Sequence, residues 1–210
     1  MSSLMVITYY GAACFKVQSG DFVLAFNPPA KESEYKSPRF GADVVFVSKN
    51  DKDYNGWENL AKKGDESAKT LLIDGKGEYE TRGIHIKGIG SNGGKINTVY
   101  ALSLEDINIC HLGAFGEKDI DPKLKADVGE VDILFLPIGG SGALDPQKAA
   151  GIAAHIEPKI VIPMHYKEVQ LKQFLKEFGS EGVKPADKLT IKRKDLADKK
   201  TEVVVLEPAV

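Results

Sequence analysis

The pattern of hydrophobic and polar positions divides the chain into two parts of different character. The first part contains short β-prone runs separated by glycine-rich turns, which predicts strands joined by tight connections. The run at 43–48 (DVVFVS) is almost continuously apolar, as is typical of a strand buried on both faces. Strands are expected over 6–10, 14–18, 22–26, 43–48, 71–73, 79–88, 98–104 and 107–110, with a helical stretch over 57–63.

The second part alternates apolar strands with helical periodicity. Asp145 and Pro146 predict the beginning of a helix, since aspartate is a good N-cap and proline fits the first helical position. A glycine turn at 139–142 precedes that helix, and Gly179 closes a later amphipathic one. This alternation predicts a layered α/β architecture in a single domain over 1–210. Its expected elements are strands over 131–136 and 158–163 and helices over 146–155 and 167–178.

Composition narrows the function classes. Of the 210 residues, 42% are hydrophobic and 28% are charged, so the chain can form both a core and a well-solvated surface. A net charge of −2 offers no electrostatic footprint for nucleic acid or an anionic membrane. No apolar run approaches membrane-spanning length and no secretory leader opens the chain, so we expect a cytoplasmic protein. Cys14 and Cys110 lie in apolar runs, which favours buried, reduced thiols.

Three polar residues follow predicted strands. They are Lys49, His111 and His165. In open α/β sheets, sites form outside the carboxyl ends of strands, so the two histidines are expected to converge although they are far apart in sequence. Two imidazoles make half of a typical zinc shell, which needs about four ligands. His85 and His155 are expected to be solvated surface residues.

Seven segments, taken together and in order, resemble the metallo-β-lactamase superfamily, and within it the small zinc-dependent hydrolases related to the ascorbate-6-phosphate lactonases. The resemblance covers nearly the whole chain and implies a four-layer αββα sandwich of the α/β class. It also implies a dinuclear zinc site and hydrolase activity. The segments are ITYYGAACF, VFVSKNDKDYN, IDGKGEYETRGI, INTVY, ICHLGAFG, LPIGG and IVIPMHY.

The chain departs from the family at the positions that would face the metals. The family's loop of Ser or Thr followed by His-x-His-x-Asp-His is matched here from Ser48 onward, and only its aspartate is present. The resemblance leaves His111, His165 and Asp53, with Asp51 beside them, as vestigial or candidate metal ligands. The replaced cleft positions are Ala12, Asn27, Lys49, Tyr54 and Ala114.

Lys49 is a further reason to expect no metal ion in the cleft. A charged ammonium has no acceptor and repels a divalent cation. We hypothesise that Lys49 fills the emptied metal cavity and pairs with Asp51 or Asp53. The alternative is that its side chain extends into solvent.

Two classes of function remain. The favoured hypothesis is a protein without dinuclear zinc activity or a bound metal, whose catalytic residues are unassigned. It would bind a ligand or protein partner, or associate with itself. The alternative is a hydrolase of lactones, esters or phosphoesters that holds one zinc or manganese ion with His111, His165, Asp53 and Asp51.

Two variations of these hypotheses complete the predictions. For the hydrolase with a single metal ion, Glu78, Glu117 and a neighbouring subunit are further candidates to complete the metal shell, and the sequence does not decide between them. A weaker idea assigns metal-independent acid–base chemistry to Lys49 and Tyr54.

Overall fold

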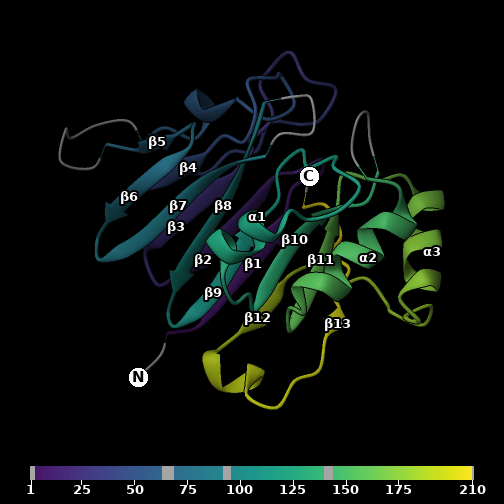
Figure 1. Ribbon diagram of the computed structural model, residues 1–210. Coiled ribbons are helices and arrows are strands. Elements are labelled where there is room, and N and C mark those ends of the chain that lie inside the picture. The colour runs from purple at the N-terminus through teal and green to yellow at the C-terminus, as the bar shows by residue number, and fades with distance from the viewer. Residues whose placement is uncertain (1–2, 63–68, 92–95, 140–143, 210) are drawn as a thin grey trace.

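The computed structural model describes residues 3–62, 69–91, 96–139 and 144–209, and two β-sheets face each other at its centre (Figure 1). The first sheet has the order β12–β1–β2–β3–β4–β5, with β1 at Met5–Tyr9, β2 at Phe15–Ser19, β3 at Phe22–Phe26, β4 at Val44–Phe46, β5 at Leu71–Ile73 and β12 at Leu189–Ile191. The second has the order β13–β11–β10–β9–β8–β7–β6, with β6 at Gly77–Thr81, β7 at Ile84–Ser91, β8 at Asn97–Leu104, β9 at Ile107–His111, β10 at Ile133–Pro137, β11 at Ile160–Met164 and β13 at Glu202–Val203.

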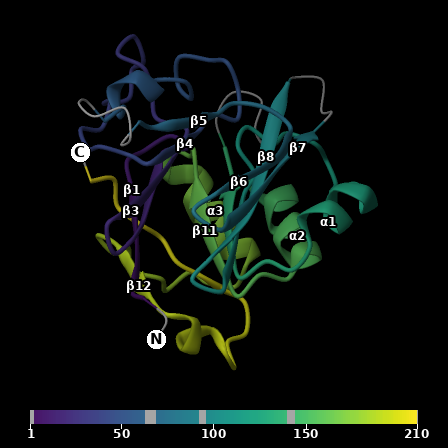
Figure 2. The same ribbon diagram turned by 90° about the vertical axis from the view of Figure 1, so that its left-hand side faces the viewer.

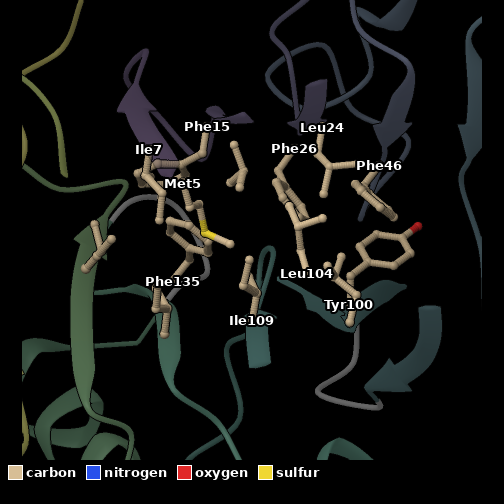
Figure 3. Close-up of a cluster of buried hydrophobic side chains, with 14 of the residues drawn as sticks. Met5, Ile7, Phe15, Leu24, Phe26, Phe46, Tyr100, Leu104, Ile109 and Phe135 are labelled. Atoms are coloured by element: carbon tan, nitrogen blue, oxygen red, sulfur yellow. The ribbon is translucent and has the colours of Figure 1, made fainter. Parts of the chain in front are cut away.

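The main hydrophobic core lies between the two sheets. Strands β1 and β2 alternate buried and partly exposed residues, as expected for strands with one face on a core. The hydroxyl of Tyr100 on β8 lies 2.8 Å from the carbonyl oxygen of Val47, which ties the second sheet to the first. Figure 3 shows this core, in which Phe15, Phe26 and Phe46 of the first sheet lie opposite Tyr100, Ile109 and Phe135 of the second.

Three α-helices lie against the second sheet, on the face away from the first sheet (Figure 2). The side chain of Asp145 accepts a hydrogen bond from the amide of Lys148, so it caps α2 as the sequence predicts. Asp121 caps α1 in the same way. These helices are α1 (Pro122–Val128), α2 (Pro146–Ile156) and α3 (Glu168–Glu177).

The outer face of the first sheet has a thinner cover. There the 3₁₀ turn η1 (Trp57–Asn59) and the chain around it pack on a small apolar cluster. The sequence predicted a helical stretch over 57–63, but in the described residues 57–62 the helical part is the three-residue η1, because Ala61 instead forms a β-bridge with Ala42. Residue 63 lies outside the described residues. Most of the predicted glycine turn at 139–142 lies outside them too.

The structure differs from the sequence prediction at one strand and at one helix. The single strand predicted over 79–88 is a hairpin, because Arg82 and Gly83 adopt positive φ angles and reverse the chain between β6 and β7. Helix α1 was not predicted, since it is short and rich in charged residues. Both cysteines are free and buried, as predicted.

No helix in the described part of the chain is both long and apolar enough to cross a bilayer.

Candidate functional site

The sequence-predicted residues follow strands whose carboxyl ends point to one edge of the sandwich. Strand β4 runs parallel to β3, and β9, β10 and β11 are parallel to one another. Lys49, Asp51, Asp53 and Tyr54 lie in the loop after β4. His165 follows β11, whereas His111 is the last residue of β9.

Lys49 forms an ion pair within its own loop. Its Nζ lies 2.9 Å from Oδ2 of Asp51, and it lies 5.9 Å from the centre of the Tyr54 ring. The hydrogen bond from Lys49 is the largest of the influences that hold the pKa of Asp51 below its ordinary value. Side-chain exposures of 25% for Lys49 and 34% for Asp51 show that this pair is reached by solvent. Lys49 therefore pairs with Asp51, one of the two aspartates that were expected.

Asp53 forms hydrogen bonds with Ser33 and Asp51. Its Oδ1 accepts a hydrogen bond of 2.7 Å from Ser33 Oγ, and its amide donates to Oδ1 of Asp51. Both aspartates of the loop thus have an oxygen engaged in a hydrogen bond inside the protein. Tyr35 lies in the same region, with its ring edge-on to His165 at 6.0 Å between centroids.

Tyr54 and His165 form the contact that joins the two loops. The Tyr54 hydroxyl lies 2.7 Å from Nδ1 of His165, and the Tyr54 side chain is almost fully buried. Burial raises the pKa of Tyr54, so the hydroxyl keeps its proton. Burial also lowers the pKa of His165, while Asp53 and Asp51 oppose that effect. Tyr54 therefore engages one ring nitrogen of His165 in a hydrogen bond.

His111 lies in the core and has no exposure to solvent. The amide of Gly113 donates to its Nδ1 at 3.0 Å, so the proton of the neutral ring is on Nε2, which lies 3.1 Å from the carbonyl oxygen of Ala13. The ring stacks on Phe26 with 5.0 Å between centroids and an interplanar angle of 1°. Burial lowers its pKa to about 3. His111 is therefore a neutral histidine with both ring nitrogens in use.

Asn27 belongs to the same buried network. Its Oδ1 accepts from the amide of Ser48 at 2.7 Å, and its Nδ2 donates to Ser48 Oγ at 3.2 Å. The amide group thus satisfies a donor and an acceptor of Ser48 without placing a charge in the core. A carboxylate at this position would be a buried charge with no cation near it among these partners.

Ala114 has its backbone fixed by Asn97 on β8. The Asn97 Oδ1 accepts from the amide of Ala114 at 2.7 Å, and its Nδ2 lies within hydrogen-bonding distance of Ser91 Oγ and the Leu112 carbonyl oxygen. Gly113 passes so closely that a Cβ there would lie 2.4 Å from Asn97 Oδ1 and 2.5 Å from Ser48. The turn after β9 is therefore tightly packed. The sequence gives Asn97 no predicted role, although it lies in the INTVY segment that resembles the family.

Three site positions adopt a left-handed backbone. Ala12, Asn27 and His165 have φ angles of 49°, 45° and 53°, although none is glycine. The His165 amide donates to the carbonyl oxygen of Ala12 at 2.8 Å, which fixes two of these residues together. Non-glycine residues in this region are strained and cluster at functional sites. The sequence carries no signal of this conformation, since it depends on the surrounding packing.

The candidate ligands do not gather into a metal shell. The described residues contain no group of three or more His, Cys, Asp or Glu side chains arranged to hold a metal ion. His111 has no free nitrogen, and one nitrogen of His165 faces Tyr54. Glu78 and Glu117 line a groove between β7 and α1 instead of the Tyr54–His165 region. The residues present therefore do not fit the dinuclear zinc site that the resemblance implies.

Comparison with known proteins identifies the class. The sequence profile of the beta-lactamase superfamily domain matches residues 6–165. A proposed Zn-dependent hydrolase of the metallo-β-lactamase superfamily from Thermotoga maritima is 30% identical, with a TM-score of 0.77 over 97% of this chain and 99% of that one. The expected metallo-β-lactamase sandwich is thereby confirmed, and the chain belongs to the β-lactamase superfamily.

Two further relatives are named as metal-dependent hydrolases. A UPF0173 metal-dependent hydrolase of Methanocaldococcus jannaschii is 29% identical over 85% of this chain and 94% of its own length. Another from Listeria welshimeri is 27% identical over 80% of this chain and 87% of its own. The chain is therefore similar, over most of its length, to proteins named as metal-dependent hydrolases.

Proposed function

We propose that this member of the superfamily does not carry out dinuclear zinc hydrolysis and works as a binding or structural module. The single observation that carries the proposal is the state of His111. Both of its ring nitrogens are engaged by the backbone, at Ala13 and Gly113, inside an aromatic core. A metal ion would need one of these nitrogens as a free lone pair, and freeing it would leave a buried backbone group without a partner.

The loop after β4 supports the same reading. Lys49 places a positive charge beside Asp51, where the family has a histidine-rich metal loop, and a divalent cation there would be repelled. Tyr54 contacts His165 directly at 2.7 Å, so the two loops are joined by a hydrogen bond without any ion. The chain thus keeps the superfamily's sandwich, with the loops after β4 and β11 joined by a hydrogen bond between its own side chains.

The test is metal content together with turnover. Untagged protein purified without chelators is incubated with zinc and, separately, with manganese, and bound metal is measured by plasma mass spectrometry after desalting. The Thermotoga maritima relative, treated in parallel, is the positive control for loading. We expect far less than one ion per chain and no metal-stimulated hydrolysis of lactone, ester or phosphoester substrates.

A stoichiometric ion would overturn the proposal if it disappears in His165→Ala or Asp53→Ala but remains in His155→Ala, an exposed histidine on α2. That outcome would instead support the mononuclear hydrolase. His165 lies within electrostatic reach of Asp51 and Asp53, which gives that alternative its physical basis.

A further inference from the structure

A groove on the second sheet lies apart from the Tyr54–His165 contact. It has a volume of about 650 Å³, within the range of small-molecule sites. Its floor is formed by β7, and its walls are the start of β6 and the helix α1, which Figure 2 shows beside β7. We propose that this groove binds a short zwitterionic molecule with an apolar middle, of the dipeptide class.

The apolar part of the groove comes from two residues. Ile89 of β7 and Leu124 of α1 both belong to or pack against the hydrophobic cluster between the second sheet and its helices, and both line the groove. Lys87, Ile89 and Ser91 alternate along β7 and therefore share one face of the strand. Charged and apolar side chains consequently stand next to each other on the floor.

The basic side chains of the groove are available for a ligand. Lys76, Lys87 and Lys123 line it, and none of them forms an ion pair with a carboxylate in the described part of the chain. On the paired strands Lys87 stands directly opposite Glu78, yet that pair is not closed to ion-pair distance either. The ammonium groups are thus free to receive an anionic group.

Glu117 provides the opposite charge. Its Oε1 is buried and has no hydrogen-bond partner among the residues that the structure describes. A buried carboxylate oxygen without a donor is costly, and turning this carboxylate toward a ligand ammonium in the groove would recover that cost. Glu117 therefore identifies the position at which a ligand's cationic group would bind.

The mixture of charges selects a zwitterion over either simple ion. The three lysines would repel a molecule that carries only a positive charge. The carboxylates of the lining, which are Glu78, Glu117, Asp121 and Asp127, would repel one that carries only a negative charge. A molecule with an ammonium, a carboxylate and an apolar side chain between them satisfies both sets and covers Ile89 and Leu124. A dipeptide has these groups and a suitable size.

The experiment is isothermal titration calorimetry of the full chain with alanyl-leucine. Two matched analogues remove one charge each: N-acetyl-alanyl-leucine lacks the ammonium, and alanyl-leucine amide lacks the carboxylate. Glu117→Gln and Lys87→Gln each remove one charge from the lining of the groove. Glu80→Gln is the control, since Glu80 is exposed on β6 and does not line the groove.

We expect alanyl-leucine to bind and both capped analogues to bind at least about tenfold more weakly, which is the effect of losing one charged hydrogen bond. Glu117→Gln and Lys87→Gln should weaken alanyl-leucine to a similar degree, with thermal melts showing that both variants fold. No binding, equal binding of the capped analogues, or Glu117→Gln with the affinity of Glu80→Gln would overturn the inference.

This inference rests on the proposed function, because it names a ligand for the binding role. Its test is independent of metal. If the chain takes up a stoichiometric ion but still binds the dipeptide through Glu117, only the proposed function fails. If metal is absent and the dipeptide does not bind, only the ligand assignment fails.

Discussion

The Tyr54 hydroxyl lies 2.7 Å from Nδ1 of His165 and thereby joins the loop after β4 to the loop after β11. In the family motif that this chain resembles, Tyr54 stands where a histidine ligand is expected. The hydrogen bond between these two residues, 111 positions apart, connects the two halves of the sandwich without a metal ion.

Tyr54→Phe should destabilise the fold by about 1–2 kcal/mol, because the partly buried Nδ1 of His165 loses its partner. Urea unfolding at neutral pH measures the change in the free energy of unfolding. Tyr35→Phe is the matched control, since Tyr35 is more exposed and contacts the same His165 ring only edge-on. Equal stability of Tyr54→Phe and the wild type would show that this hydrogen bond contributes nothing.

His111 should make stability depend on pH. Its pKa is lowered to about 3 in the folded protein, whereas an unfolded chain has a histidine pKa of about 6.5. Between these values only the unfolded state binds the proton, so stability is complete above pH 6.5 and falls towards pH 3 by up to about 1.4 kcal/mol per pH unit. In His111→Gln this contribution is absent, although the variant is less stable at neutral pH.

The measurement is urea unfolding of wild type and His111→Gln at several pH values from 7 to 4. The stability difference between them should narrow as the pH falls. Carboxylates titrate in the same range in both proteins, so the comparison isolates the histidine. A difference that stays constant with pH would contradict a neutral, buried His111.

Gly113→Ala should be among the most damaging single-methyl changes in the chain. A Cβ at Gly113 would lie 2.4 Å from Asn97 Oδ1 and 2.5 Å from Ser48, and its φ of 62° is unfavourable for alanine. Steric overlap and backbone strain together should cost about 3 kcal/mol or more. The control is Gly179→Ala, with a φ of 66° and open space around it, which should cost about 1–2 kcal/mol. Thermal melts that give equal losses would refute the packing argument.

Lys49→Met should raise the pKa of Asp51 towards its ordinary value, because the hydrogen bond from Lys49 is the largest influence lowering it. Carbon NMR titration of the Asp51 carboxyl measures this shift. Lys52→Met is the control, since Lys52 acts on Asp51 only through weak charge interaction. A larger effect from Lys52→Met would argue against the Lys49–Asp51 pair.

Lys49→Met should have only a small effect on the free energy of unfolding. Asp51 titrates with a lowered pKa in the folded state, so the ion pair stabilises the fold above the unfolded pKa of about 4 and the contribution is lost as the pH falls through the folded value. Solvent reaches both side chains, so the loss in Lys49→Met should stay below about 1 kcal/mol and shrink in high salt.

The sequence by itself determined much of the framework. Strand β3 and strand β5 begin and end where their apolar runs do, and Asp145 caps α2 as its position before a proline implies. These features depend on local hydrophobic patterns and on capping, which are written in neighbouring residues. The resemblance to the family also predicts from the sequence which positions of the metal loop are replaced, since this needs only a comparison of residue types.

Only the tertiary structure decided what the remaining polar residues do. The sequence places His111 at a strand end, but its ring is held by Ala13, 98 positions away, and stacks on Phe26. Whether a histidine presents a lone pair to a cleft or buries it depends on such distant partners. The left-handed turn at Arg82 likewise depends on the pairing of β6 with β7, because arginine carries no local preference for it. Local sequence therefore set most of the strands, and contacts between distant segments set the turn between β6 and β7 and the chemistry of the strand ends.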